Sequence, residues 1–213
     1  MCIRDSQYIV SNALKILNND KGASILNTRA AMICEYTDWP DVVGNETDYG
    51  TFAGHFYDPD TGKNWMGQKN PTARTRAETY YQSAVAAYKD GYTDKAMEYL
   101  GKGTHYVSDL NEPHHASNLT AVNSNHSDFE KYVDKHRTEY TIAGNSFGTN
   151  VYSSAENTTV GDMLYSAAKD AKALAGLAQN KDTYSSAGNQ SVQNAIKTIS
   201  KYIYKFGKEV GIY

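Results

Sequence analysis

Hydrophobic residues recur at helical spacing along most of the chain. Apolar side chains three and four residues apart form one face of an α-helix. The pattern predicts helices over residues 7–17, 24–36, 72–89, 93–110, 126–140, 160–178 and 190–210. We find neither an alternating strand pattern nor an internal repeat. The sequence therefore predicts an all-α fold, a single-domain helical bundle spanning residues 1–213.

Turn-forming residues support several of these boundaries. Asp90-Gly91 ends the third expected helix, Thr93 is a good N-cap for the fourth, and Pro113 ends that helix. Gly101 lies inside the fourth helix, where glycine costs about 1 kcal/mol relative to alanine. We therefore expect Gly101 to serve either close approach of another element to a ligand face or plain helix–helix packing.

Two segments are expected to be loops. Residues 144–157 are polar and contain glycine, while residues 37–71 contain three of the four prolines and five glycines. A long irregular segment in a compact domain is usually functional. The turn at residues 58–62 (DPDTG) resembles a calcium loop only superficially, because Lys69 occupies the twelfth position, where a calcium loop has glutamate.

The strongest chemical signal lies between residues 105 and 130. His105 precedes Asp109 by four residues, and His126 precedes Glu130 by four, so each pair shares one helix face. His115 lies on the connection between them. Imidazole and carboxylate together suit zinc or a similar cation, so we interpret the set as metal ligands rather than a structural polar cluster.

One further histidine occurs in the long loop. His55 is surrounded in sequence by Phe52, Phe56, Tyr57 and Trp65. Taken alone, it would be read as a histidine packed among aromatic rings. The ligand-rich centre elsewhere makes an additional metal ligand the better interpretation.

Composition limits the alternatives. The chain has 213 residues and a formal net charge of −3, with no basic block typical of nucleic-acid binding. No apolar run approaches the roughly 20 residues that a membrane span needs. Cys2 and Cys34 permit one disulfide, although we expect Cys34 to be a free thiol. The start has no apolar leader, so the chain is either cytosolic or a mature or truncated form.

Several motifs together resemble the zinc-dependent phospholipases C of bacteria, including the catalytic domain of alpha-toxin. The likeness spans nearly the whole chain. It is carried by IVSNALKILNND, HFYDPDTGKNW, YLGKGTHYVSDLNEPHHASNLTAV, HSDFEKYVD and YIYKFGKEV, and by the spacing of the four ligand-bearing positions after His105. The resemblance implies a helical bundle whose cleft holds zinc.

The resemblance also implies a ligand set. The first metal would be bound by Asp41, His55, His105 and Asp109, and the second by His115, His126 and Glu130. Asp41 would also act as general base; Asp38 is the alternative for this upstream position. Asp109 would bridge the first and a third metal. Phe52 matches an aromatic residue that contacts the choline headgroup in the family, with simple loop packing as the alternative.

The N-terminus departs from the family pattern. The family holds its third metal through an N-terminal tryptophan and a histidine just before the first helix, where this chain has Ser6 and no tryptophan. The residues present therefore support two zinc sites, and we expect residues 1–6 to be a truncated or non-native start. A genuine two-metal variant is the other explanation. The C-terminal membrane-binding sandwich of alpha-toxin is not expected in this chain.

The function implied is hydrolysis of the glycerol-side phosphodiester of phospholipids such as phosphatidylcholine, by a secreted, monomeric bacterial enzyme acting at a membrane surface. A single-strand nuclease or nucleotidase of the related zinc class is one alternative. A non-catalytic zinc-binding bundle is the other. Nucleic acid is not expected as a partner, given the ordinary charge balance.

Overall fold

The structure is a computed structural model that describes residues 3–213, with side chains described from Ser6 onward. The α-helices are α1 (Ile3–Lys21), α2 (Ser24–Thr28), α3 (Ala30–Thr37), α4 (Ala73–Lys89), α5 (Thr93–Leu110), α6 (His126–His136), α7 (Thr149–Glu156), α8 (Val160–Ala173), α9 (Ala175–Ala178) and α10 (Tyr184–Glu209). Short 3-10 turns are η1 (Trp39–Asp41), η2 (Asp48–Gly50), η3 (Ala53–His55), η4 (His115–Ser117), η5 (Arg137–Glu139), η6 (Ala143–Asn145) and η7 (Lys181–Thr183). The described residues contain no β-strand, only an isolated bridge between Asp58 and Lys63.

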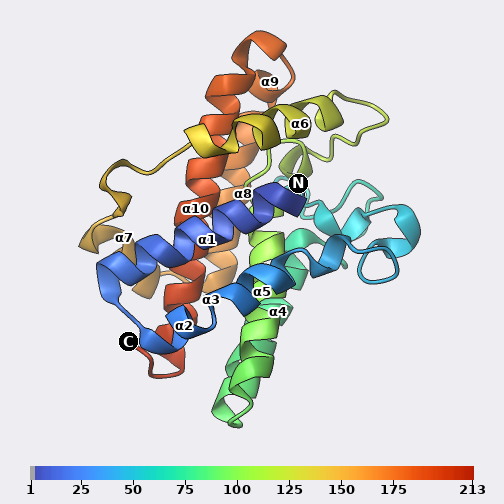
Figure 1. Cartoon of the computed structure of the whole chain (residues 1–213). Coiled ribbons are helices and arrows are strands. Elements are labelled where there is room, and N and C mark those ends of the chain that lie inside the picture. The colour runs from blue at the N-terminus through green and yellow to red at the C-terminus, as the bar shows by residue number, and fades with distance from the viewer. Residues whose placement is uncertain (1–2) are drawn as a thin grey trace.

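Two helices form the centre of the bundle. α5 packs against both α3 and α4, and α10 packs against α1, α7 and α8 (Figure 1). From Ala96 onward most of α5 is buried, including its polar residues. A helix buried on nearly every side must satisfy its polar groups internally. The C-terminal end of α5 is therefore a natural place for a polar site inside the core.

Close helix contacts explain two glycines of α5. A Cβ atom at Gly101 would lie 2.5 Å from the carbonyl oxygen of Ile33 and 2.8 Å from Cβ of Tyr36, both on α3. A Cβ atom at Gly103 would overlap the hydroxyl of Tyr202 on α10. Gly101 thus allows the helix packing that was expected as one of its two roles. The same contact brings the C-terminal end of α3 beside the candidate ligands of α5.

The segment between α3 and α4 is irregular, as predicted, and contains three 3-10 turns. In Figure 1 it lies on the same side of the bundle as the connection between α5 and α6. It ends where the Thr72 hydroxyl accepts a hydrogen bond from the Thr75 amide, 3.1 Å away, at the N-terminus of α4. This cap places the start of α4 at Ala73, one residue after the predicted start at Thr72.

Several expected boundaries were wrong. Residues 144–157 are not all loop, because α7 occupies Thr149–Glu156 and buries Tyr152 and Ala155 against the core. Thr93 is the first residue of α5 rather than its cap, which is Tyr92. The helix expected over 24–36 is divided between α2 and α3 at Arg29. α1 and α10 begin earlier than expected, at Ile3 and Tyr184, and the first turns of α10 bury Tyr184 and Ala187.

Two smaller predictions concern the thiol of Cys34 and the lack of a membrane-spanning segment. Cys34 is a half-buried free thiol, and burial raises its pKa to about 11. Cys2 lies outside the described residues. Among the described helices, none combines the length and apolar character needed to cross a membrane.

Candidate metal centre

The structure brings all seven predicted ligands into one region of the molecule. Asp41 ends η1, His55 ends η3, and His105 and Asp109 lie on α5. The others come from the opposite wall of the same region: His115 begins η4, and His126 and Glu130 lie in the first two turns of α6. The set divides into two clusters that meet at Asp109.

The first cluster contains two imidazoles and two carboxylates. His55 Nδ1 and His105 Nε2 face each other at 3.0 Å. Asp109 Oδ2 lies 3.1 Å from the former and 3.3 Å from the latter. Asp41 Oδ1 lies 3.6 Å from His55 Nδ1 and 3.5 Å from His105 Nε2. Two nitrogen and two oxygen donors therefore surround one point.

Backbone carbonyls fix the proton positions on both histidines of the first cluster. His105 Nδ1 donates to the carbonyl oxygen of Thr37 at 2.8 Å, and His55 Nε2 donates to that of Glu46 at 3.1 Å. A carbonyl oxygen only accepts, so these nitrogens carry the protons. The two nitrogens that face each other therefore carry lone pairs when both rings are neutral. Lone pairs at 3.0 Å repel one another unless a cation or a proton lies between them.

The second cluster has three donors. His115 Nε2 and His126 Nε2 are 3.1 Å apart. Glu130 Oε1 lies 3.1 Å from His126 Nε2 and 3.7 Å from His115 Nε2. Three protein ligands leave one position of a tetrahedral zinc open, which is typical of catalytic rather than structural zinc.

Asp109 connects the clusters. While its Oδ2 faces the first cluster, its Oδ1 lies 3.0 Å from His115 Nδ1 in the second. A carboxylate that accepts from the outer nitrogen of a histidine fixes the ring so that its other nitrogen can bind metal. Asp109 is fully buried. Its pKa stays well below the usual value because the charges of His105 and His115 outweigh the opposing effect of burial.

The structure distinguishes the two candidates for the upstream aspartate by position. Asp41 faces the first cluster and is 18% exposed toward the cleft. Asp38 turns away and accepts a hydrogen bond from the side-chain amide of Gln7 on α1. Burial is the main cause that raises the pKa of Asp38 to about 7, and the nearby charge of Asp41 adds to it. The geometry thus agrees with Asp41 as the member of the donor set.

The protonation of the imidazoles follows their surroundings. Burial alone would lower the pKa of His55, but its hydrogen bond to Asp109 and the negative charges of Asp109 and Asp41 raise it. Burial lowers the pKa of His105 despite the same carboxylates. Deprotonated imidazole is the form that binds a metal.

Sequence reasoning missed Glu112. It is buried on the connection after α5, and its carboxylate lies close enough to His115 and His126 to be a third potential ligand there. Its oxygens are engaged, however: Oε2 accepts from the backbone N–H of His115 at 2.6 Å and Oε1 faces His114 Nδ1 at 2.9 Å. These contacts with His114 hold the pKa of Glu112 at about 2, against the effect of burial. We therefore assign Glu112 a structural role, in which its carboxylate holds the turn that carries His115. Its position three residues before His115 in the sequence would have suggested this role.

The two remaining histidines were expected to be non-ligands. His114 is buried, and its second ring nitrogen, Nε2, lies 3.1 Å from Asn125 Oδ1. His136 faces Glu139 at 2.8 Å near the surface. His114 stacks on the ring of His126, with ring centroids 5.2 Å apart, but both of its ring nitrogens face other partners.

A cavity of about 940 Å³ opens over both clusters. Its polar floor includes Asp41, His55, His115, His126 and Glu130. Its walls are largely aromatic and aliphatic: Phe52, Phe56, Trp65, Ala121 and Val122. A mainly apolar cleft with few convergent polar groups is typical of a small-molecule or lipid site.

Phe52 is one of these wall residues. Its ring centroid lies 5.5 Å from that of His55, and its backbone is left-handed, with φ of 52°. A left-handed conformation is unfavourable for a bulky residue and persists only where surrounding structure imposes it. The loop therefore holds the Phe52 ring against His55 in the wall of the cleft.

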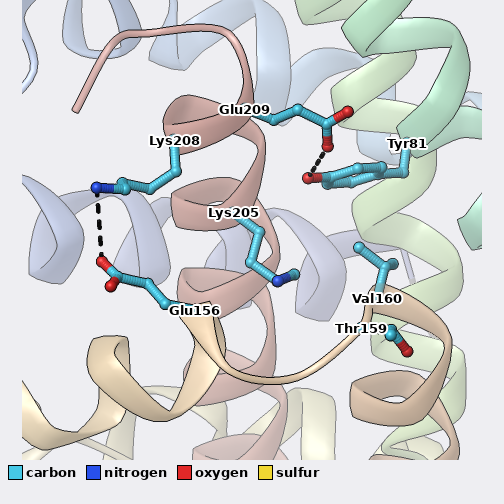
Figure 2. A pocket seen from close by; sticks show the side chains of 7 residues that line it. All are labelled: Tyr81, Glu156, Thr159, Val160, Lys205, Lys208 and Glu209. Carbon is cyan, nitrogen blue, oxygen red and sulfur yellow. Dashed lines mark hydrogen bonds and ion pairs between the residues drawn. The ribbon is translucent and has the colours of Figure 1, made fainter.

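A second cavity, of about 460 Å³, lies between α4, α10 and the α7–α8 connection (Figure 2). Its charged side chains are matched with one another. Tyr81 donates to Glu209 at 2.9 Å, and Lys208 faces Glu156 at 3.7 Å. Lys205 donates to the carbonyl oxygen of Ala155 at 2.8 Å. This cavity offers no converging set of donors among the described residues comparable to the first cleft.

Comparisons with known proteins bear on this geometry. The family model described as zinc dependent phospholipase C matches residues 7–202. A phospholipase C of Paraclostridium bifermentans is 29% identical over 95% of this chain and 58% of its own length. A phospholipase C of Bacillus cereus is 38% identical over 48% of this chain and 39% of its own length.

Solved structures agree with the fold. The alpha toxin from Clostridium absonum has a TM-score of 0.86 at 28% identity, over 97% of this chain and 63% of that one. A Clostridium perfringens alpha-toxin has a TM-score of 0.78 at 25% identity over the same shares. The chain thus spans less than two thirds of the relatives it matches, and within that span its fold is theirs.

Proposed function

This chain belongs to the zinc-dependent phospholipase C family, and we propose that it hydrolyses the glycerol-side phosphodiester of phospholipids to diacylglycerol and a phosphorylated headgroup. The observation that carries the proposal is the pair of facing imidazole nitrogens in each cluster, 3.0 and 3.1 Å apart. Two nitrogens bound tetrahedrally to zinc at about 2.0–2.1 Å are separated by about 3.3 Å. The donor set therefore fits zinc with little movement.

The ligands would be Asp41, His55, His105 and Asp109 at one metal and His115, His126 and Glu130 at the other. Bound zinc neutralises phosphodiester charge and lowers the pKa of a water molecule enough to make hydroxide available near neutral pH. The family would add a third ion.

Asp41 is our candidate for the general base. It is the most exposed carboxylate of the first cluster and lines the cleft, so its second oxygen is accessible to a water molecule. Asp109, by contrast, is fully buried and faces histidines on both sides. A group that takes a proton from water must reach both the water and the site where phosphorus is attacked.

Phe52 would contact the headgroup. Its ring lines the cleft, and the aromatic face attracts a quaternary ammonium such as choline by cation–π interaction. We therefore propose phosphatidylcholine as a substrate.

The surface around the cleft suits a lipid interface. Large hydrophobic side chains are exposed on the surrounding loops, and these are Val42, Val43, Tyr49, Trp65, Met66 and Val122. Val43 and Val122 are 90% and 97% exposed. Contiguous exposed apolar groups mark a protein or membrane contact. We propose a membrane surface as the partner, a secreted location and a monomeric state.

The test compares three substrates. Phosphatidylcholine vesicles, single-stranded DNA and a soluble phosphodiester are incubated with the protein, with a chelator and with added zinc. We expect lipid turnover that the chelator abolishes and zinc restores. Cleavage of DNA in preference to lipid would overturn the proposal in favour of the nuclease chemistry, and zinc binding without any turnover would indicate a non-catalytic bundle.

A further inference from the structure

Arg76 lies against the loop that carries His55 and makes no hydrogen bond to a predicted ligand within the described part of the chain. It is in the first turn of α4, and its side chain is 14% exposed. Its guanidinium group makes a two-pronged contact with Asp48, with Nη1 to Oδ2 at 3.1 Å and Nη2 to Oδ1 at 2.5 Å. A charged side chain that is buried to this degree needs a structural or functional reason.

One further contact leads from Arg76 to His55. Arg76 Nη1 also donates to the carbonyl oxygen of Glu46 at 3.1 Å. This is the same carbonyl oxygen that accepts from His55 Nε2. The guanidinium group thus holds in place the acceptor that keeps a proton on Nε2 and leaves the lone pair of Nδ1 toward the cluster.

Two other contacts fix the same unit. Asp48 Oδ2 accepts from the backbone N–H of Gly54, 2.7 Å away and one residue before His55. The guanidinium carbon of Arg76 lies 5.4 Å from the ring centroid of Tyr106, whose hydroxyl donates to the Glu46 carboxylate at 2.5 Å. The guanidinium group of Arg76 therefore contacts both Asp48, which binds Gly54, and Glu46, which binds His55.

The backbone conformation of this loop shows why it needs these contacts with Arg76. Asp48 and Tyr49 are in the left-handed region, with φ of 49° and 58°. Such residues cost on the order of 1–3 kcal/mol each and persist only where the surroundings hold them. Gly54 also makes room for Arg76, because a Cβ atom at Gly54 would overlap the guanidinium group.

We infer that Arg76 is a positioning residue that sets the affinity of the first metal site, by holding the Glu46 carbonyl oxygen against His55. This inference rests on the proposed function, since it concerns the same metal site. Lysine cannot replace arginine here, because one ammonium group does not reproduce a planar fork that binds a carboxylate through two nitrogens and a carbonyl oxygen at once. Outer partners of metal-binding histidines typically change metal affinity 10- to 100-fold.

The experiment measures zinc affinity rather than activity. Zinc is titrated against a competing chelator in the full chain carrying Arg76→Lys, with bound metal counted by elemental analysis. We expect about 10- to 100-fold weaker binding of one zinc equivalent and unchanged binding of the other. Cobalt substituted for zinc should show an altered visible spectrum for the same single site.

The matched control is Arg74→Lys. Arg74 lies on the same helix and pairs with Glu78 and the Tyr57 hydroxyl instead of the loop. Its substitution should leave both zinc affinities unchanged. Asp48→Asn keeps the shape of the side chain but removes the charge that Arg76 binds, and it should weaken the same zinc equivalent by a smaller factor. This second variant keeps the inference testable if Arg76→Lys fails to fold.

The outcomes separate the two proposals. If the unmodified protein binds zinc and both Arg76→Lys and Asp48→Asn bind it equally well, the role assigned to Arg76 is wrong while the metal centre stands. If both zinc equivalents weaken together, Arg76 supports the fold generally and the inference also fails. If the unmodified protein binds no zinc, the proposed metal centre itself is wrong.

Discussion

The two donor clusters are assembled in different ways. In the second, His126 and Glu130 are one turn apart on α6, so helix formation alone brings them together. In the first, His55 comes from η3 in the long loop and must meet His105 of α5 from about fifty residues away. The outer nitrogens of both these histidines donate to backbone carbonyls on neighbouring segments. The first cluster therefore depends on tertiary packing, and the second depends mostly on one helix.

This difference indicates which substitutions should weaken metal binding at each cluster. Changes in helix packing or loop support should affect the first cluster and spare the second. A change at Asp109 should affect both, because its two oxygens face different clusters. The predictions below use this contrast, in order of decreasing effect.

The largest effect is expected from Asp109→Asn, which would remove the negative charge shared by both clusters. We expect loss of both zinc equivalents and at least about a thousandfold lower phospholipid turnover. Elemental analysis and vesicle assays measure this. The exposed Asp170→Asn on α8 is the matched control. Retention of either zinc at full affinity would show that the clusters are independent.

Next come His55→Gln and His126→Gln, which each remove one donor from one cluster. Each variant should lose one zinc equivalent and keep the other, with turnover reduced about a hundredfold or more, since the outer support of a histidine alone is worth 10- to 100-fold. Metal-to-protein stoichiometry checks the result. Simultaneous loss of both equivalents in either variant would contradict the division into two clusters.

A packing change should act on the first cluster alone. Gly101→Ala would push α3 from α5 and lengthen the hydrogen bond between Thr37 and His105. We expect a destabilisation of about 1–3 kcal/mol from overpacking and weaker binding of one zinc equivalent. Gly176→Ala is the control, because nothing lies within 4 Å of its added Cβ atom. Equal thermal unfolding of both variants would refute the packing role of Gly101.

A smaller effect, on stability, concerns pH and Asp38, which borders the first cluster. Its folded pKa of about 7 lies above the ordinary value of 3.8, so the folded state keeps a proton that the unfolded state releases. This favourable contribution is full at low pH and is lost as pH rises toward 7. In zinc-free protein, Asp38→Asn should therefore gain about 1–2 kcal/mol of stability relative to wild type at pH 8 and little at pH 4. A gain that is the same at both pH values in thermal unfolding would contradict the assigned pKa.

A fifth prediction tests the apolar rim of the cleft. Replacing Val43 and Val122 with serine should lower turnover of phosphatidylcholine vesicles about tenfold or more, since each valine would bury apolar surface in the lipid. Turnover of a soluble phosphodiester should not change. Leu177→Ser, at a site 39% exposed on α9, is the control. An equal loss on both substrates would assign these valines to the fold instead.

Much of the fold could be predicted because helices follow from local patterns of apolar and polar residues. The α5 boundaries Thr93–Leu110 matched the expected 93–110, and α4 ended at Lys89 as expected. The errors fell where burial outweighed local composition. α7 has a polar, glycine-flanked sequence, yet Tyr152 and Ala155 are fully buried by neighbouring helices.

The chemical types of the site were predictable for the same reason. Spacings of four residues revealed His105 with Asp109 and His126 with Glu130, without knowledge of the fold. The supporting groups were not predictable. The carbonyl oxygens of Thr37 and Glu46 have no sequence signature, since every residue carries one, and Arg76 resembles any other charge near the start of a helix.

The sequence by itself indicated a set of candidate metal ligands and predicted that helices would carry most of them, because side-chain chemistry and helical periodicity are local properties. Only the tertiary structure decided that Asp41 rather than Asp38 faces His55, and which ring nitrogens of His55 and His105 face each other. The ring orientations depend on where the carbonyl oxygens of Thr37 and Glu46 lie, and the packing of distant segments places them there.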